Sequence, residues 1–408
     1  MSSPHAVRSH MPGSLGAAVL LLLLTLPLCT AAGGPDMLSD ILKEAKQKFA
    51  PDRRTVVFDI QPEPKGKIVV LRGEIHSIAL KKDLFAFLAL HKEFVFEDSI
   101  QTLPQPIVGD RTRGVVSVSV ANIRSKPDHA AEMATQAILG TPLRILKKEH
   151  GWYFVQTPDD YLGWTDDRIE MMTPASFEAW TAKPKAIVTT EITFLHAGDD
   201  PSSEVVGDVV AGGLLALTGE TEASFGVEFP DGRAAVLPRA MGTPYIEWLA
   251  RAHPTPENIL TTARRFFGVP YLWGGTSAKG MDCSGFIKTV FFLNGVVMPR
   301  DASQQVDVGE PVDTTGGVDL KPGDLLFFGF RATPERRERV THVAISLGGK
   351  RFIHASTDVR VNSLAPADTD YSQHREQMFL RARRVIGARP APGVKFLKDL
   401  PDYGGGRE

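Results

Sequence analysis

Apolar residues recur at two different spacings in the segment that follows the N-terminus. Stretches with apolar residues at helical spacing alternate with stretches typical of strands. Pro62, Pro64 and Gly66 separate two of the expected strands. The expected helices and strands are 37–49, 55–60, 68–71, 80–91 and 93–96. This pattern predicts a small α/β module over residues 35–108, in which no site is recognisable.

Short β-rich runs replace this alternation over residues 109–173. Glycine, proline and aspartate separate the runs, which is typical of a small β-barrel. A second series of strands covers 185–247 and lacks the Gly-Trp pairs of the first, so we expect a divergent copy of the same barrel. A proline-containing segment at 252–256 then separates this copy from a final domain, 255–388, and residues 389–408 remain as a C-terminal tail.

The final domain begins with a helical pattern at 257–267 and continues into a glycine-rich loop that leads to Cys283. Gly274, Gly275 and Gly280 permit tight backbone turns in this loop. The apolar residues that follow predict a helix beginning near Cys283. The N-terminus of a helix carries a partial positive charge, so we expect the thiolate form to be favoured at this cysteine.

A β-hairpin is predicted over residues 341–356. A two-residue Gly-Gly loop would point His354 away from the face that carries His342, whereas a three-residue loop, 348–350, places His354 opposite Ala344 on the same face as His342. The apolar residues favour the three-residue loop, since it gathers them on one side. The resulting faces are Val343, Ile345 and Leu347 for packing, and His342, Ala344, Ser346, His354 and Ser356 for a site.

Composition and charge change this picture only slightly. The chain has 408 residues, of which 43% are hydrophobic and 23% are charged, and its formal net charge is −2. These values are typical of about two to four domains of ordinary soluble type. The near-neutral charge, without a long basic run, argues against nucleic acid as the main partner.

Residues 1–32 have the layout of an export signal. Basic residues precede an apolar core at 15–28, which is shorter than the roughly 20 residues of a membrane-spanning helix, and small residues follow the core. We expect cleavage near Ala32 and a location in the periplasm or cell envelope. An uncleaved anchor and lipidation at Cys29 are the alternatives, but Leu28 stands where a lipoprotein signal usually has a small residue.

Cysteine usage then singles out Cys283. The sequence has only two cysteines, and Cys29 would leave with the signal, so no internal disulfide is expected. An isolated cysteine is more often buried and inert than reactive. Two histidines on one hairpin face favour the reactive alternative, with Cys283 as nucleophile, His342 as its base and His354 as the group that orients the base. Because no acidic or cysteine cluster completes a metal site with these histidines, we expect no metal and no other cofactor.

Two segments carry the motifs of known families. The first barrel resembles the bacterial SH3-like (SH3b) modules of cell-wall enzymes, in the motifs Val120-Ala-Asn-Ile-Arg-Ser-Lys-Pro, Gly140-Thr-Pro-Leu, Gly151-Trp-Tyr and Gly163-Trp. The final domain resembles the NlpC/p60 family of cell-wall cysteine peptidases, in the motifs Tyr271-Leu-Trp-Gly-Gly, Asp282-Cys-Ser-Gly-Phe, Leu320-Lys-Pro-Gly-Asp-Leu-Leu-Phe-Phe, Thr341-His-Val-Ala-Ile and Ile353-His-Ala-Ser. Together they imply a multidomain α+β protein, with a papain-like cysteine peptidase domain preceded by two SH3-like β-barrels and the small N-terminal α/β module.

The resemblance to the peptidases also implies roles for particular residues. Cys283 is the nucleophile, His342 is the general base and acid, and His354 is the orienting third member. Tyr271 helps to form the oxyanion site with the backbone near Cys283. The implied substrate contacts are Asp282, Ser284 and Trp273, together with Asp301 and Ser303 in Pro299-Arg-Asp-Ala-Ser-Gln-Gln.

SH3-like modules ahead of such a domain resemble the subgroup that cleaves γ-D-glutamyl to diamino-acid bonds in muropeptides with a free N-terminal L-alanine. In that subgroup the first module closes one end of the groove and reads the terminal amine with an acidic and an aromatic residue, for which Glu132 and Tyr161 are the candidates. Glu132 could equally be a solvated loop carboxylate, and Tyr161 could pack inside the barrel. The expected partners are therefore peptidoglycan stem peptides or muropeptides, and we expect a monomer that binds neither nucleic acid nor metal.

Two other classes of function stay open at this point. In the first, the protein binds or scaffolds the cell wall with a degenerate peptidase domain. In the second, the papain-like domain transfers amides, or acts as an endopeptidase on intact, cross-linked wall. The sequence does not identify which diamino acid follows the glutamate.

Overall fold

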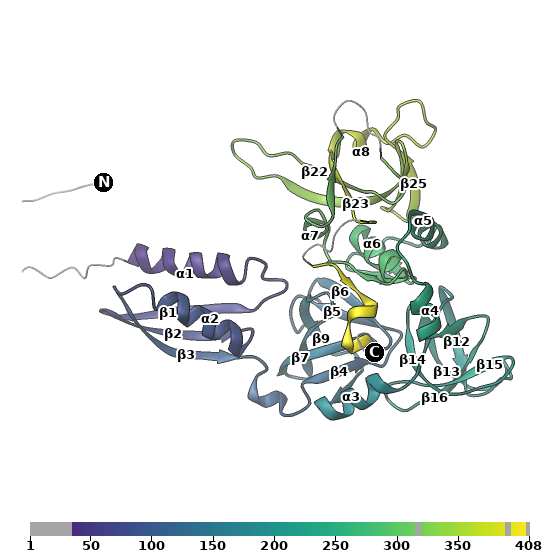
Figure 1. The fold of residues 1–408 in the computed structure, drawn as a ribbon, viewed down its shortest axis with the longest axis horizontal. Helices are drawn as coiled ribbons and strands as arrows, with labels where there is room; N and C mark the ends of the chain where they lie inside the picture. The colour runs from purple at the N-terminus through teal and green to yellow at the C-terminus, as the bar shows by residue number, and fades with distance from the viewer. Residues whose placement is uncertain (1–34, 315–319, 388–392, 405–408) are drawn as a thin grey trace, which may run out of the picture.

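The computed structural model describes residues 35–314, 320–387 and 393–404. Figure 1 shows the N-terminal module at one side, two β-rich domains beneath, and the C-terminal domain above them. The expected export signal, 1–32, lies outside the described residues. Within the described ranges, no helix is long and apolar enough to cross a membrane.

In the N-terminal module two helices cover one face of a three-stranded sheet. Its elements are α1 (Pro35–Phe49), β1 (Phe58–Lys65), β2 (Ile68–Ile75), α2 (Ile78–Leu88) and β3 (Val95–Thr102). Strand β2 pairs antiparallel with β1 and parallel with β3. Alternate residues of β2, among them Val69 and Leu71, meet Ala45 and Leu84 of the helices in one buried core. The predicted α/β module is confirmed.

Strand β1 is longer than the sequence pattern predicted. It continues through Pro62 and Pro64, which pair with Leu71 and Val69 of β2, although these prolines were expected in a loop. Proline has no N–H to donate, and it is tolerated in a strand at the edge of a sheet. Because β1 is an edge strand, and the two prolines occupy alternate positions, the missing N–H groups lie on the same side of the strand.

The two β-rich domains have the same topology. Barrel 1 consists of β4 (Arg113–Val116), β5 (Val120–Arg124), β6 (Met133–Ile138), β7 (Pro142–Glu149), β8 (Trp152–Gln156), β9 (Leu162–Thr165) and β10 (Ile169–Met172). Barrel 2 consists of β11 (Lys185–Val188), β12 (Ile192–His196), β13 (Val205–Val210), β14 (Leu214–Glu220), β15 (Ser224–Glu228), β16 (Ala234–Pro238) and β17 (Gly242–Pro244). Helix α3 (Pro174–Ala182) connects them.

The strand orders identify barrel 2 as a copy of barrel 1. The order in barrel 1 is β10-β4-β7-β8-β9-β5-β6, and the order in barrel 2, read in the opposite direction, is β17-β11-β14-β15-β16-β12-β13. When the seven strands of each barrel are numbered from its own first strand, both orders become 7-1-4-5-6-2-3. All the strand pairs in both are antiparallel. The expected divergent copy is therefore confirmed.

The C-terminal domain is built on a six-stranded sheet in the order β21-β26-β22-β23-β24-β25. Its strands are β21 (Glu310–Val312), β22 (Leu325–Phe330), β23 (Arg339–Gly348), β24 (Arg351–Ala355), β25 (Val359–Ser363) and β26 (Phe379–Arg384). Its helices are α5 (Pro256–Arg265), α6 (Cys283–Phe292), α7 (Ala302–Gln305) and α8 (Gln373–Met378), and α4 (Tyr245–Arg251) precedes them and packs against β11 and β17 of barrel 2. The short pairs β18 (Thr276–Ser277) with β19 (Gly280–Met281), and β20 (Val296–Val297) with β27 (Lys395–Phe396), complete it.

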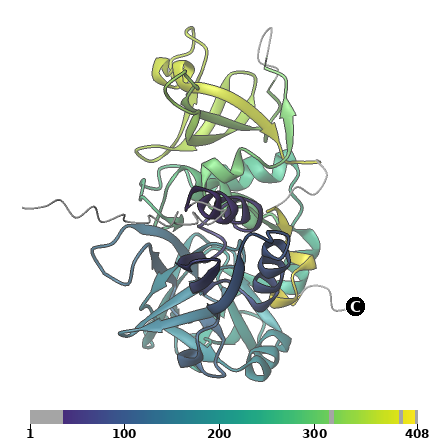
Figure 2. The same cartoon turned by 90° about the vertical axis from the view of Figure 1, so that its left-hand side faces the viewer.

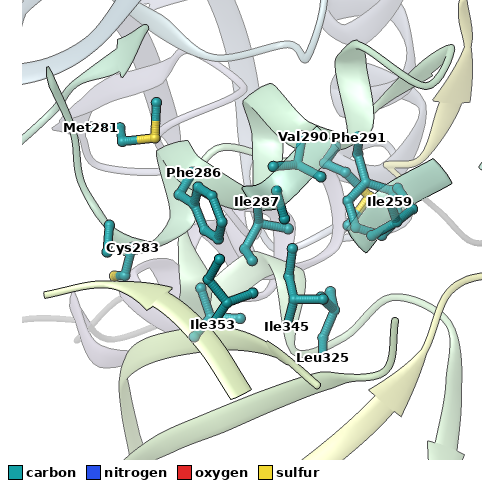
Figure 3. Close-up of a cluster of buried hydrophobic side chains, with 14 of the residues drawn as sticks. Ile259, Met281, Cys283, Phe286, Ile287, Val290, Phe291, Leu325, Ile345 and Ile353 are labelled. Atoms are coloured by element: carbon teal, nitrogen blue, oxygen red, sulfur yellow. The ribbon is translucent and has the colours of Figure 1, made fainter. Parts of the chain in front are cut away.

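The main core lies between α6 and one face of this sheet. Figure 3 shows α6 lying over the strands, with Cys283 at one end and Val290 and Phe291 at the other. Phe286 and Ile287 of the helix and Ile345 of the hairpin are fully buried in this core. The helix predicted from the apolar run after Cys283 is thus confirmed, and its packing fixes Cys283 relative to the sheet.

The described part of the C-terminal tail, 393–404, packs against the rest of the protein. Strand β27 pairs with β20, and Leu397 is fully buried. The Lys395 ammonium donates to the Pro158 carbonyl and to both carboxylate oxygens of Asp160, each at 2.8 Å. These contacts join the tail to barrel 1 as well as to the C-terminal domain.

Candidate active site

The glycine-rich loop and the start of α6 are held by the carboxylate of Asp282. It is the N-cap residue, accepting hydrogen bonds from the backbone N–H of Gly285 at 2.7 Å and of Gly274 at 2.9 Å. Gly274 has φ +79°, and a Cβ there would lie 2.2 Å from the Met133 carbonyl oxygen of barrel 1. Only glycine allows this close approach. The loop therefore fixes Cys283 and also seats the domain against barrel 1.

The electrostatic surroundings of Cys283 differ from the expectation. Burial raises the pKa of the thiol to about 11, and the neighbouring Asp282 carboxylate adds to the increase. The backbone N–H groups of Val343 and Ser284 lower this pKa, but by less. The predicted preference for thiolate is wrong for the resting site, because desolvation outweighs the field of the helix N-terminus. The cysteine therefore needs a base to become nucleophilic.

The hairpin brings the two histidines to one face, as predicted. Ile345 pairs with Ile353, so the register places Ala344 opposite His354. The loop itself differs from the expected three residues, because Gly348 pairs with Arg351 and the register shifts between Ser346 and Gly348. A bulge at Leu347 takes up the extra residue, with Gly348 at φ +101° beside it, and the register at the histidines is unchanged.

A chain of hydrogen bonds connects the histidines to Asn362 on β25. His342 Nε2 lies 2.7 Å from His354 Nδ1, and His354 Nε2 lies 2.9 Å from Asn362 Oδ1. The Asn362 amide donates to the Asp370 carbonyl at 2.9 Å, which fixes the amide with its oxygen toward His354. His354 therefore carries its proton on Nε2 and His342 on its own Nε2. This tautomer leaves Nδ1 of His342 free to accept a proton.

Both histidines are neutral in the resting site. Burial, followed by the Arg375 guanidinium, lowers the pKa of His342 well below its usual value. Burial lowers the pKa of His354 to about 4, against the hydrogen bond to Asn362, which raises it. Cys283 lies against the same strand as His342, since the next residue, Val343, belongs to the same buried cluster as the cysteine. A neutral thiol and a neutral imidazole therefore form the resting pair, the starting state for general-base activation of a nucleophile.

Tyr271 and Arg375 complete the surroundings of the thiol. Burial, and then the Cys283 and Asp282 charges, raise the pKa of the Tyr271 hydroxyl, so it stays protonated and can donate to an oxyanion. Arg375 on α8 is partly buried, which lowers its pKa, while Cys283 and Tyr271 raise it. The site thus combines a hydroxyl donor with a cation beside the nucleophile.

Asp282 and Ser284, implied as substrate contacts, are buried with exposed fractions of 6% and 5%. The Arg300 guanidinium, itself 1% exposed, donates to Asp282 Oδ2 at 2.6 Å and to Ser284 Oγ at 3.0 Å. It also donates to Thr135 Oγ1 of barrel 1 at 2.9 Å. In the described structure both residues serve to hold the nucleophile loop and the domain interface.

The remaining predicted contacts meet at the junction with barrel 1. The Trp273 indole N–H donates to Glu132 Oε1 at 2.9 Å, and the Tyr161 hydroxyl donates to Asp301 Oδ2 at 3.0 Å. Ser303 lies beside Asp301 at the start of α7. Glu132 and Tyr161, both from barrel 1, are thus in contact with two of the predicted substrate contacts of the C-terminal domain, Trp273 and Asp301. Tyr161 thus bonds to the Asp301 carboxylate, whereas Glu132, the acidic residue expected to act with it, bonds to Trp273.

Sequence reasoning did not single out Arg300, Asn362, Arg375 or Arg54. A signal existed for Asn362, because the alternation along β25 puts it on the face of Arg360, which pairs with His354. Arg300 directly precedes Asp301 in Pro299-Arg-Asp-Ala-Ser-Gln-Gln, but only its burial in the structure shows that it needs a carboxylate partner. Arg375 and Arg54 carry no local signal. Among the described residues, no group of three or more metal-binding side chains could hold a metal ion.

Comparisons with known proteins agree with this geometry. A model of the NlpC/P60 family matches residues 268–384, and a model of the bacterial dipeptidyl-peptidase SH3 domain matches residues 123–167. A γ-D-glutamyl-L-lysine dipeptidyl-peptidase of Bacillus cereus is 30% identical over 249 residues, which cover 59% of this chain and 72% of that relative. Dipeptidyl-peptidase 6 of Lysinibacillus sphaericus is 28% identical over 268 residues, which cover 64% of this chain and 94% of the relative.

The crystal structure of an NlpC/P60 family protein from Bacillus cereus superposes with a TM-score of 0.57 at 25% identity. The superposition covers 67% of this chain and 99% of that one. The matched segments include Cys283, both histidines and barrel 1 from residue 123 onward. The chain therefore belongs to the NlpC/P60 family of cysteine peptidases, with a bacterial dipeptidyl-peptidase SH3 domain ahead of its peptidase domain.

Proposed function

We propose that this peptidase hydrolyses the bond between γ-D-glutamate and a diamino acid in peptidoglycan peptides with a free N-terminal L-alanine. The observation that carries the proposal is the hydrogen bond of 3.0 Å from Tyr161 of barrel 1 to Asp301 of the peptidase domain. A carboxylate held by a tyrosine at the end of the groove suits an ammonium group. Relatives named as γ-D-glutamyl-L-lysine dipeptidyl-peptidases support the same substrate class.

The cation beside the nucleophile supports the γ-linkage. A γ-linked glutamyl residue keeps its α-carboxylate free, a few bonds from the carbonyl that is attacked. Arg375 is coupled electrostatically to both Cys283 and Tyr271. Its guanidinium therefore provides a partner for that carboxylate near the reacting carbonyl.

The reaction follows from the resting tautomers. Nδ1 of His342 takes the proton of Cys283 as the sulfur attacks the γ-carbonyl carbon, and the oxyanion receives hydrogen bonds from the backbone N–H near Cys283 and from Tyr271. The protonated imidazole is stabilised through His354 and gives the proton to the leaving amine, so the C–N bond breaks and a thioester remains. A water, deprotonated by His342, attacks the thioester, releases L-Ala-γ-D-Glu and restores the thiol.

Mass spectrometry of the products tests the proposal. The substrates are L-Ala-γ-D-Glu-L-Lys and the diaminopimelate analogue, each with a free and an acetylated amine. We expect release of the dipeptide from the free forms only. Equal cleavage of the acetylated forms would contradict the exopeptidase part of the proposal and favour an endopeptidase.

Substitution of the nucleophile provides the control. Cys283→Ala should abolish hydrolysis and leave the circular dichroism spectrum unchanged, because it removes only a sulfur from a buried position. Residual activity at the wild-type level would refute the mechanism. We further propose, from the layout of residues 1–32, that the enzyme acts in the cell envelope.

A further inference from the structure

The loop between α1 and β1 brings the N-terminal module to the end of the substrate groove. The backbone N–H of Leu162 donates to the Arg54 carbonyl at 2.8 Å, and the Gln156 amide donates to the Thr55 carbonyl at 3.0 Å. Leu162 directly follows Tyr161. Figure 2, in which the module faces the viewer, shows it over the junction of barrel 1 and the peptidase domain. The loop is therefore fixed on barrel 1 beside the tyrosine that bonds to Asp301.

The side chain of Arg54 reaches across this junction into the peptidase domain. One guanidinium nitrogen lies 2.7 Å from Asp301 Oδ2 and 2.8 Å from Ser303 Oγ. Asp52 holds the other side of the guanidinium, at 2.8 Å from Nε and 2.7 Å from the second terminal nitrogen. The Gln304 amide donates in turn to Asp52 at 2.8 Å. The Arg54 guanidinium and the Tyr161 hydroxyl therefore both donate to the same oxygen, Asp301 Oδ2.

The module that supplies Arg54 lies outside the segments shared with the family models, which begin at residue 123. The Bacillus cereus structure is covered over 99% of its length by 67% of this chain. Arg54 therefore lies outside the matched family segments, whereas its partner Asp301 lies inside one of them.

We propose that Arg54 is a specificity-determining residue. Its guanidinium occupies the position of the substrate's N-terminal ammonium and so lowers the affinity of the site for peptides with a free amine. The inference rests on the proposed function, since it assumes that this ammonium binds at Asp301. Guanidinium and ammonium groups seek the same carboxylate, and two cations a few ångströms apart repel each other. An incoming peptide must displace Arg54 or bind beside it at a cost in affinity.

The surroundings of Arg54 permit its displacement. The side chain is 33% exposed and its partner Asp301 is 28% exposed, and ion pairs at such exposure contribute little to stability. A cavity of about 610 Å³ borders the module here, and it is lined by Arg54, Gln156, Ser303 and Gln304. The guanidinium has room to move into this cavity while it stays paired with Asp52.

Steady-state kinetics of Arg54→Gln tests the proposal on L-Ala-γ-D-Glu-L-Lys and its acetylated form. Loss of the competing cation should lower KM for the free-amine peptide about twofold to fivefold with little change in kcat, the scale of one partly exposed ion pair. The acetylated peptide should remain uncleaved, and the affinity of Cys283→Ala for it should be the same with and without Arg54→Gln. Arg54→Lys, which keeps the charge, should resemble the wild type. Arg53→Gln is the matched control, because Arg53 is the exposed neighbour in the same loop.

Three results would overturn the inference. A higher KM for the free-amine peptide in Arg54→Gln would mean that Arg54 assists binding by positioning Asp301. An equal change in the affinity of Cys283→Ala for the free-amine and the acetylated peptide would indicate a structural role only. The proposal requires that Arg54→Gln no longer lowers KM when Asp301 is replaced by Asn. The same fall in KM in the Asp301→Asn background would show that the two residues are not coupled.

A binding experiment separates this inference from the proposed function. If the wild-type protein releases no dipeptide, the proposed function fails, and calorimetric titration of Cys283→Ala with L-Ala-γ-D-Glu-L-Lys still reports on Arg54. Tighter binding when Arg54→Gln is added supports competition at Asp301. Equal affinity with and without Arg54, or no binding to either protein, refutes it.

Discussion

Barrel 1 and barrel 2 share one strand order but contact the peptidase domain with different chemistry. In barrel 1, Asp159 pairs with Lys288 of α6 at 2.7 Å, and the two side chains are 1% and 15% exposed. In barrel 2, Asp208 pairs with Lys279 at 2.5 Å, and these side chains are 30% and 39% exposed. The ion pair that joins barrel 1 to the peptidase domain is therefore buried, and the ion pair that joins barrel 2 to it is partly exposed to solvent.

The residue before the sixth strand shows the same contrast. In barrel 1 this residue is Tyr161, ahead of β9, and its hydroxyl donates to Asp301 of the peptidase domain. In barrel 2 it is Arg233, ahead of β16, and its guanidinium donates at 2.8 Å to the carbonyl of Ser117 in barrel 1. One topological position contacts the peptidase domain in the first copy and joins the two barrels in the second.

This difference shows that the barrel fold alone does not determine its role. The same seven-stranded order supports a groove wall and a spacer, and the distinction lies in a few side chains at corresponding positions. Substitutions in barrel 1 should therefore affect the peptidase, whereas matched substitutions in barrel 2 should affect only stability.

The largest expected effect is on stability at the buried interface. Asp159→Ala removes the partner of Lys288 and leaves a largely buried ammonium without its carboxylate, which should cost about 3 kcal/mol in the free energy of unfolding. Urea unfolding followed by tryptophan fluorescence measures this loss. The matched change in barrel 2, Asp208→Ala, breaks a more exposed pair and should cost less than about 1 kcal/mol. Equal losses in the free energy of unfolding in the two variants would contradict the contrast between the buried ion pair of barrel 1 and the partly exposed ion pair of barrel 2.

The sequence predicted the elements that depend on local pattern. Alternation along the hairpin was enough to place His342 and His354 on one face, and the apolar run after Cys283 was enough to predict α6. The register survived an error in the loop because the bulge at Leu347 lies between the turn and the histidines. Local periodicity constrains which residues share a face more strongly than it constrains turns.

Properties set by long-range packing could not be predicted in the same way. The raised pKa of Cys283 follows from burial under the sheet, which a helix N-terminus read in isolation does not reveal. The contact of Arg54 with Asp301 joins residues separated by 247 positions in different domains. Arg54 itself lies in a loop that had no recognisable motif. Such contacts depend on how whole domains dock, and no spacing in the sequence encodes them.

The next effect in size is on substrate affinity at the groove. Tyr161→Phe keeps the buried ring but removes the hydroxyl that holds Asp301, and KM for L-Ala-γ-D-Glu-L-Lys should rise about tenfold, the scale of one hydrogen bond to a charged group. Tyr245→Phe, directly after the last strand of barrel 2, is the matched control. Its hydroxyl is buried and has no hydrogen-bond partner among the described residues, so KM should not change. A similar rise in both variants would remove the functional distinction between the barrels.

The smallest effect is expected in barrel 2. Arg233→Ala removes the bond to Ser117, a second bond of 2.9 Å to the Val206 carbonyl, the ion pair of 2.9 Å with Asp231 and the contact with Phe229, so the free energy of unfolding should fall by about 1 kcal/mol. Arg168→Ala is the control, since Arg168 also faces Asp231 but is 64% exposed, and its loss should be within about 0.5 kcal/mol. In both variants kcat/KM should equal the wild-type value. A fall in kcat/KM for Arg233→Ala alone would mean that barrel 2 sets the position of barrel 1 at the groove, and the spacer would then be part of the substrate-binding apparatus.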